Sequence, residues 1–143
     1  MALFGRKKRR LTRLLVVEDE PLVAFATEHL LGDAGFEVVD TVDRVADAMR
    51  VIESGVEIDL VLVDVNLADG SGIDVARAAQ ARGMCVMFVT GNCPGEARAF
   101  AAGCLSKPYS PRDLLAAIDA VEAVVDGREP KRLPSGFALF ERA

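Results

Sequence analysis

The chain has 143 residues, of which 51% are hydrophobic and 27% are charged, and its formal net charge is −5. This length suits one domain of ordinary size, and the hydrophobic content provides a full core and excludes a largely disordered chain. The negative charge argues against a nucleic-acid-binding domain, so we do not expect nucleic acid as a partner. No apolar stretch approaches the ~20 residues of a membrane helix, and we expect no membrane span.

Basic residues gather at the N-terminus, in a leader over residues 1–10. They are Arg6, Lys7, Lys8, Arg9 and Arg10. The apolar run behind them stops at Glu18 and is too short for the ~7–15-residue centre of a signal peptide, so we expect a cytoplasmic protein. A solvated extension is the favoured interpretation of the leader, while docking to an anionic lipid, nucleic acid or protein surface stays open.

The three cysteines, Cys85, Cys93 and Cys104, have neither CxxC spacing nor the neighbours of a metal site. An odd number of cysteines suits a reducing compartment. We expect Cys85 and Cys104, which lie in apolar runs, to be inert buried thiols. Cys93 falls just past Thr90, but nothing nearby would activate its thiol, and redox sensing there is the minor interpretation.

Apolar blocks of strand length alternate with longer stretches of helical period, which is the pattern of repeated βαβ units. The predicted strands cover residues 11–17, 36–41, 58–63, 84–90 and 103–107. The predicted helices cover residues 21–33, 44–54, 72–82, 95–102 and 113–126. Five strands and five helices in strict alternation predict a three-layer α/β sandwich with a parallel sheet and right-handed crossovers.

Hydrophobic patterning also predicts where some strands lie in the sheet. Residues 36–41 alternate only partly, which favours an edge position, whereas residues 58–63 are a continuous apolar block typical of a central strand. The stretch 64–72 carries two glycines, and we expect it to be an irregular loop.

The last segment, residues 127–143, does not fit the repeat because Pro130 and Pro134 break any helix. The chain therefore divides into the leader 1–10, a main domain over 11–126 and a tail over 127–143. A tail folded back on the domain is the favoured interpretation, and a segment offered to a partner is the alternative.

Residues suited to phosphoryl chemistry stand at the ends of four predicted strands. Glu18 and Asp19 follow the first strand, Asp64 follows the third, Thr90 ends the fourth and Lys107 ends the fifth. Parallel strands share one C-terminal edge, so we expect these side chains to meet there.

The residue types at this edge fit one reaction. Three carboxylates this close together need a cation, and hard oxygen ligands with open positions suit Mg²⁺. An ionised carboxylate attacks phosphorus without a general base, provided that the phosphoryl oxygens are neutralised. Mg²⁺, the Lys107 ammonium and the Thr90 hydroxyl would each neutralise one oxygen. The edge is therefore predicted to place one phosphoryl group on one aspartate.

Residues 11–126 resemble the receiver domain of bacterial two-component response regulators. The matching residues are the acidic pair Glu18-Asp19, the phospho-acceptor Asp64, the switch residue Thr90 with a small neighbour, and Lys107-Pro108. The resemblance implies a flavodoxin-like doubly wound fold, with a five-stranded parallel sheet of order 2-1-3-4-5 and five helices. Phe88-Val89-Thr90-Gly91 is also similar to the Phe-Ala-Thr-Gly signature of a subset of single-domain regulators.

The same resemblance implies the ligands and partners of the site. It implies a Mg²⁺ ion, or Mn²⁺ in its place, on Glu18, Asp19, Asp64 and the backbone carbonyl of Asn66. It also implies a cis peptide bond before Pro108. A sensor histidine kinase or phosphotransfer protein would donate the phosphoryl group. The phosphorylated chain would then contact a downstream protein of unknown identity or drain phosphate from the kinase; a homodimer is compatible with either role.

One departure concerns the relay beyond the site. Receiver domains usually have an aromatic residue three positions before the lysine, which turns inward when the threonine moves, and this chain has Cys104 there. Tyr109 is a candidate replacement, although an aromatic that packs in the core is the favoured interpretation of that residue.

Two other functions are compatible with such an edge. A metal-dependent phosphohydrolase with an aspartate nucleophile usually has an Asp-x-Asp motif, whereas Asp64 is followed by Val65 and Asn66. A receiver that binds partners without phosphorylation is the other alternative, but every catalytic position is filled. We expect a single-domain response regulator and not an enzyme that acts on an external metabolite.

Overall fold

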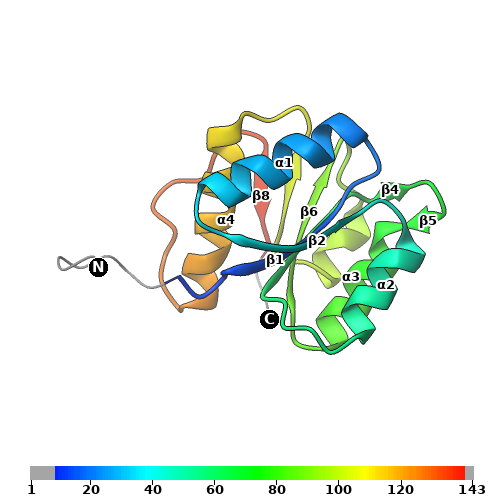
Figure 1. Ribbon diagram of the computed structural model, residues 1–143. Helices are drawn as coiled ribbons and strands as arrows, with labels where there is room; N and C mark the ends of the chain where they lie inside the picture. The colour runs from blue at the N-terminus through cyan, green and yellow to red at the C-terminus, as the bar shows by residue number, and fades with distance from the viewer. Residues whose placement is uncertain (1–8, 141–143) are drawn as a thin grey trace.

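The computed structural model describes residues 9–140, and its centre is a six-stranded sheet in the order β2-β1-β3-β6-β7-β8 (Figure 1). The strands are β1 (Arg13–Val17), β2 (Glu37–Val42), β3 (Leu60–Val63), β6 (Cys85–Thr90), β7 (Gly103–Ser106) and β8 (Phe137–Leu139). The first five run parallel, and their order is the predicted 2-1-3-4-5. The half-buried β2 lies at the edge and the fully buried β3 at the centre, as their hydrophobic patterns predicted.

Helices cover both faces of the sheet and complete the predicted doubly wound sandwich. They are α1 (Pro21–Asp33), α2 (Val45–Glu53), α3 (Gly72–Ala81) and α4 (Pro111–Val125). In Figure 1, α1 and α4 lie on one face and α2 and α3 on the other. Side chains on alternate positions of the strands feed two cores, so Leu105 packs with α4 while its neighbour Cys104 packs with α3.

The predicted helix over residues 95–102 is wrong in type and length. The structure has a 3₁₀ helix, η1 (Gly95–Ala99), held by a hydrogen bond of 3.0 Å from the Phe100 N–H to the Ala97 carbonyl. The helix cannot extend further because Ala102 already donates to the Val86 carbonyl of β6, at 2.8 Å. Hydrogen bonding to the sheet therefore overrides the helix propensity of this alanine-rich segment.

The predicted irregular loop over 64–72 contains a small antiparallel hairpin, β4 (Asn66–Leu67) and β5 (Gly70–Ser71). Strands of two residues leave no periodic pattern in the sequence. The hairpin carries Asp69, whose carboxylate accepts hydrogen bonds from the N–H groups of Val45 and Ala46 at 2.7 and 3.1 Å. Asp69 thereby caps the N-terminus of α2 from another part of the chain.

The C-terminal segment folds back on the domain as far as residue 140, because β8 pairs antiparallel with β7. Gly103 makes the close approach possible, since a Cβ at this position would lie 2.6 Å from the ring of Phe137. Residues 141–143 lie outside the described residues. This added antiparallel strand was not among the predicted elements.

The described end of the basic leader lies against α4. Arg10 pairs with Asp126 at 2.7 Å, and Arg9 lies 3.5 Å from Asp119. The buried Glu122 accepts a hydrogen bond of 3.0 Å from the Leu11 N–H. The remaining basic residues of the leader lie outside the described part of the chain. Between residues 9 and 140, no helix is both long and apolar enough to cross a membrane.

Candidate functional site

Backbone pairing brings two of the predicted acids to one edge of the sheet. Beyond the last residues of β1 and β3, Glu18 donates its N–H to the Val42 carbonyl at 2.9 Å, and Asp64 donates its own to the Val17 carbonyl at 3.0 Å. Both carboxylates are therefore fixed at the C-terminal edge, and both residues are nearly buried, at 5% and 6% exposure.

Three carboxylates meet at this edge and form what we call the acidic cluster: Glu18, Glu20 and Asp64. One oxygen from each lies within 4.8 Å of the others. Burial raises the pKa of Glu18 above its ordinary value, although hydrogen bonds from Lys107 and from the Glu20 N–H oppose this. Such a cluster of hard oxygens is chemically suited to a divalent cation such as Mg²⁺.

Lys107 neutralises the acidic cluster in this structure. Its Nζ atom lies 2.8 Å from Glu18 Oε1, 2.7 Å from Glu20 Oε1 and 2.8 Å from Asp64 Oδ2. Burial by itself would lower the pKa of the ammonium, but the three hydrogen bonds outweigh it and raise this pKa above its ordinary value. The peptide bond from Lys107 to Pro108 is cis, the isomer that the resemblance implied.

The third carboxylate of the cluster differs from the one named in the sequence prediction. Asp19 was expected there, and the structure brings Glu20 to that place instead. Glu20 donates its N–H to Glu18 Oε2 at 3.1 Å, and this turn carries its side chain over Lys107. The sequence shows Glu20 next to the acidic pair, but it does not show which way the turn before Pro21 directs each side chain.

The loop after Asp64 packs tightly around this residue. Asn66 donates its N–H to Asp64 Oδ1 at 3.1 Å, which orients the carboxylate. Gly72 begins α3 so close to Asp64 that a Cβ at residue 72 would overlap the Asp64 carbonyl oxygen. Gly72 also donates its N–H to the Val65 carbonyl at 2.7 Å. The absence of a side chain at residue 72 therefore fixes the position of the Asp64 backbone.

Thr90 ends β6 at the same edge, and its hydroxyl has no partner. The residue is fully buried, and Thr90 Oγ1 makes no hydrogen bond to any other described residue. Its carbonyl accepts a hydrogen bond of 2.9 Å from the Lys107 N–H, so the backbone of Thr90 is tied to the lysine loop. A buried hydroxyl without a partner is costly and rare, and it indicates a site that expects an acceptor.

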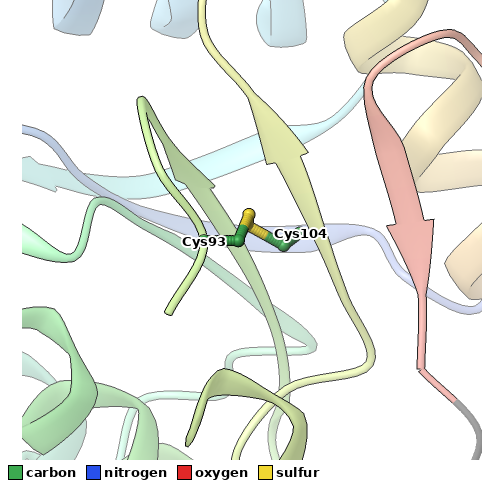
Figure 2. Close-up of a disulfide and its surroundings, with 2 residues drawn as sticks. All are labelled: Cys93 and Cys104. Carbon is green, nitrogen blue, oxygen red and sulfur yellow. A yellow bond between two sulfur atoms is a disulfide. The ribbon is translucent and has the colours of Figure 1, made fainter. Parts of the chain in front are cut away.

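The prediction of an inert thiol at Cys104 is wrong, because this residue is joined to Cys93 in a disulfide (Figure 2). Cys104 is paired with Phe88 in the sheet, and Cys93 lies in the loop that follows Thr90. The Cα atoms of the two cysteines are 6.4 Å apart, within the ordinary range for a disulfide. The contact depends on the register of two strands and the path of a loop, which spacing alone does not reveal.

Tyr109 lies on the other side of the sheet from this disulfide. Its ring packs with the core under α1 and α4, and its hydroxyl is 3.4 Å from Thr27 Oγ1. Cys104 belongs to the opposite core. The favoured interpretation of Tyr109 as a core-packing aromatic agrees with this position, and its ring does not fill the place beside Cys104.

The model of the response regulator receiver domain family matches residues 14–119 of the chain. The chain belongs to this family. As a receiver domain, it carries the acid, hydroxyl and lysine of the described site within or directly beside the sheet that defines the fold. The acidic cluster is consistent with the Mg²⁺ site of receiver domains.

Known relatives place this receiver domain among bacterial regulators. It is 31% identical to the phyllosphere-induced regulator PhyR of Methylorubrum extorquens over 113 residues, which are 75% of this chain and 42% of the relative. It is also 31% identical to the cell cycle transcriptional regulator CtrA of Caulobacter vibrioides over 122 residues, covering 76% of this chain and 49% of CtrA. The receiver domain thus spans less than half of either relative.

A solved structure has the same architecture. The CheY-like response regulator receiver domain protein of Methanospirillum hungatei superposes with a TM-score of 0.73 and 28% identity, over 82% of this chain and 98% of that one. The comparison therefore covers a complete receiver domain, and β8 lies in the part of our chain that follows the matched family region.

Proposed function

We propose that this chain is a single-domain response regulator that accepts one phosphoryl group on Asp64. The observation that carries the proposal is the pairing of a buried strand-end aspartate with Lys107, at 2.8 Å, inside a cluster of three carboxylates. A lysine held there neutralises the nucleophile before the reaction and can follow the negative charge to the transferred group afterwards.

The residues of the site have separate roles in this transfer. A carboxylate oxygen of Asp64 forms a bond to phosphorus while the phosphorus–nitrogen bond of a donor phosphohistidine breaks, and the imidazole leaves with the bonding electrons. Lys107 binds one oxygen of the transferred group. The Thr90 hydroxyl donates to another, which gives its unpartnered proton an acceptor.

We propose that Glu18 and Asp64 hold the divalent cation, with Asp19, Glu20 and the Asn66 carbonyl as the further oxygen ligands. Mg²⁺, or Mn²⁺ in its place, supplies charge neutralisation on the phosphoryl oxygens when it is bound. The donor set fits, because carboxylate oxygens from three residues lie within 4.8 Å. The residues must release Lys107 from part of the cluster to bind the ion, which couples metal binding to lysine position.

A groove beside the site suits the donor protein. It lies between α1 and the lysine loop, has a volume of about 420 Å³, and is lined by apolar residues together with Glu20 and Lys107. Leu22 and Phe25 stand on the exposed side of α1, at 84% and 64% exposure. We propose that a sensor histidine kinase or phosphotransfer protein docks a helix here, with its phosphohistidine over Asp64. Such donors place the reaction in the cytoplasm.

The chemistry of the chain is then limited to gain and loss of the phosphoryl group on Asp64, without turnover of an external metabolite. Acetyl phosphate with Mg²⁺ tests this directly, because it needs no partner protein. The intact mass should rise by one phosphoryl group, and Asp64→Asn should abolish the rise. Asp74→Asn, the same change at an exposed position of α3, should leave it intact. A full mass gain in the Asp64 variant would overturn the proposal.

A further inference from the structure

The disulfide lies directly behind the residue that we propose reads the phosphoryl group. Cys93 is the third residue after Thr90, and Cys104 lies fully buried in β7 (Figure 2). The bridge closes a loop over residues 93–104, which we call the bridged segment and which contains η1. The chain that leaves Thr90 is therefore covalently attached to the neighbouring strand.

The bridged segment is held at both ends, and the bridge is one of its few strong attachments. Thr90 is bonded to Lys107 through its carbonyl on one side of Cys93, and Ala102 is bonded to Val86 in the sheet on the other side. Between these points, η1 buries Ala97 and accepts one side-chain hydrogen bond, from Gln80 to the Ala99 carbonyl at 3.1 Å. Without the bridge, few contacts would restrain residues 91–96, and local opening would cost little free energy.

Thr90 is the element that must move when Asp64 is phosphorylated. Its hydroxyl is buried without a partner, so a new acceptor on Asp64 would attract it, and residues 91–93 must follow the movement. A covalent bond from Cys93 to β7 limits that movement. This step rests on the proposed function, whereas the restraint on the bridged segment does not.

The two sulfurs differ in access in a way that suits reversible exchange. Cys93 is half-buried at the loop surface and Cys104 is fully buried. An attacking thiolate therefore reaches the Cys93 sulfur, forms a mixed disulfide there and releases Cys104 as the leaving thiolate, which takes up a proton. A second thiol then displaces Cys93, so one protein disulfide and two thiols give two protein thiols and one small disulfide. Closure is the reverse, with a low-molecular-weight disulfide as the oxidant.

We propose that Cys93 and Cys104 form a redox-controlled latch on the segment that follows Thr90. A low-molecular-weight disulfide closes the latch, and a thiol reductant opens it. The open form transmits the phosphorylation state of Asp64 to the surface of η1, and the closed form does not. In a reducing compartment the latch is open at rest, so closure reports oxidative conditions and silences the output.

The first experiment tests the exchange by itself. The folded wild-type chain is equilibrated in glutathione redox buffers at neutral pH, and the bridge is followed by intact mass after thiol alkylation and by peptide mapping. We expect full interconversion, with Cys93 and Cys104 in one linked peptide pair. Cys85→Ser should behave as wild type, and Cys93→Ser should form no bridge. A pair that stays reduced in oxidised glutathione, or a bridge that includes Cys85, would overturn the latch.

The second experiment tests its consequence. Hydrogen exchange over residues 91–102 is compared with and without beryllofluoride and Mg²⁺, which mimic phosphorylated Asp64. We expect the exchange rates to change severalfold in reduced wild type and in Cys93→Ser, and to stay unchanged in the oxidised chain. Equal changes in both redox forms would contradict the latch.

Mass gain with acetyl phosphate separates this failure from failure of the proposed function. If neither redox form gains a phosphoryl group on Asp64, the proposed function is wrong. The latch is then judged on the exchange rates without beryllofluoride, where bridged and reduced chains must still differ severalfold over residues 91–102. If these rates are equal, the bridge does not restrain the segment and the latch is wrong as well.

Discussion

The carboxyl edge of the sheet has a charged half and a bridged half, and different forces hold them. In the charged half, Lys107 lies within 2.8 Å of carboxylates from the ends of β1 and β3. In the bridged half, Thr90 keeps a buried hydroxyl without a partner, and the loop behind it is fixed to β7 by a disulfide. Ion pairs of the first kind exchange readily with a metal or a phosphoryl group, whereas a covalent bond changes only through thiol chemistry. The comparison suggests that the halves divide reception of the signal from its onward control.

The largest effect should come from removing the cation of the charged half. Lys107→Met leaves the nearly buried Glu18 and Asp64 without their partner, so stability without metal should fall by about 3 kcal/mol. Phosphorylation by acetyl phosphate should slow by roughly a hundredfold, because one donor to the transferred oxygens is lost. Thermal unfolding and the time course of mass gain measure the two effects.

Lys131→Met, the same change at an exposed lysine of the C-terminal segment, is the matched control and should change neither quantity. Mg²⁺ should raise the melting temperature of Lys107→Met more than that of wild type, since the ion replaces the lost positive charge. An equal Mg²⁺ shift in both proteins would show that lysine and metal do not share the acidic cluster.

A glycine on the charged half should be nearly as sensitive. In Gly72→Ala the new Cβ would overlap the carbonyl oxygen of Asp64, so the start of α3 or the Asp64 backbone must shift. We expect a loss of about 3 kcal/mol in stability, measured by urea unfolding, and slower phosphorylation. Gly32→Ala in α1 is the control, because nothing lies within 4 Å of its added Cβ and removal of a helical glycine should stabilise by up to about 1 kcal/mol. Similar stabilities for both variants would contradict the described packing.

The smallest effect concerns Asp69, which joins the hairpin beside the site to α2. Hydrogen bonds from the Val45 and Ala46 N–H groups lower the pKa of Asp69 below its ordinary value of 3.8. A carboxyl whose pKa is lower in the folded state stabilises the protein above its unfolded-state pKa, and this contribution is lost as the pH falls through the folded-state value. Urea unfolding at several pH values should therefore show a small acid-dependent loss that Asp69→Asn lacks. Asp33→Asn, at the exposed end of α1, should keep the wild-type dependence.

The two halves also differ in how far the sequence predicts them. Strand ends follow from apolar blocks, and parallel strands share an edge, so Asp64, Thr90 and Lys107 were placed correctly at one edge before the structure was known. The order of the five parallel strands was likewise predicted, with the help of the family resemblance. These features depend on patterns that repeat along the chain.

Features that depend on single turns were not predicted. The turn before Pro21 decides that Glu20 rather than Asp19 joins the acidic cluster. The register of β6 and β7 decides that Cys104 meets Cys93. The pairing of β8 with β7 depends on the absence of a side chain at Gly103 and on the ring of Phe137. Side-chain direction in a turn and contacts across strands have no periodic pattern, which is why the bridged half emerged only from the structure.

Location of the phosphoryl group on the chain tests the central claim most directly. Borohydride reduces an aspartyl phosphate to homoserine, and peptide mass mapping then reads the position of the modified residue. After treatment with acetyl phosphate and Mg²⁺, the account predicts homoserine at residue 64 in both the oxidised and the reduced chain. Modification at Asp19, at Glu20 or at any residue other than Asp64 would contradict it.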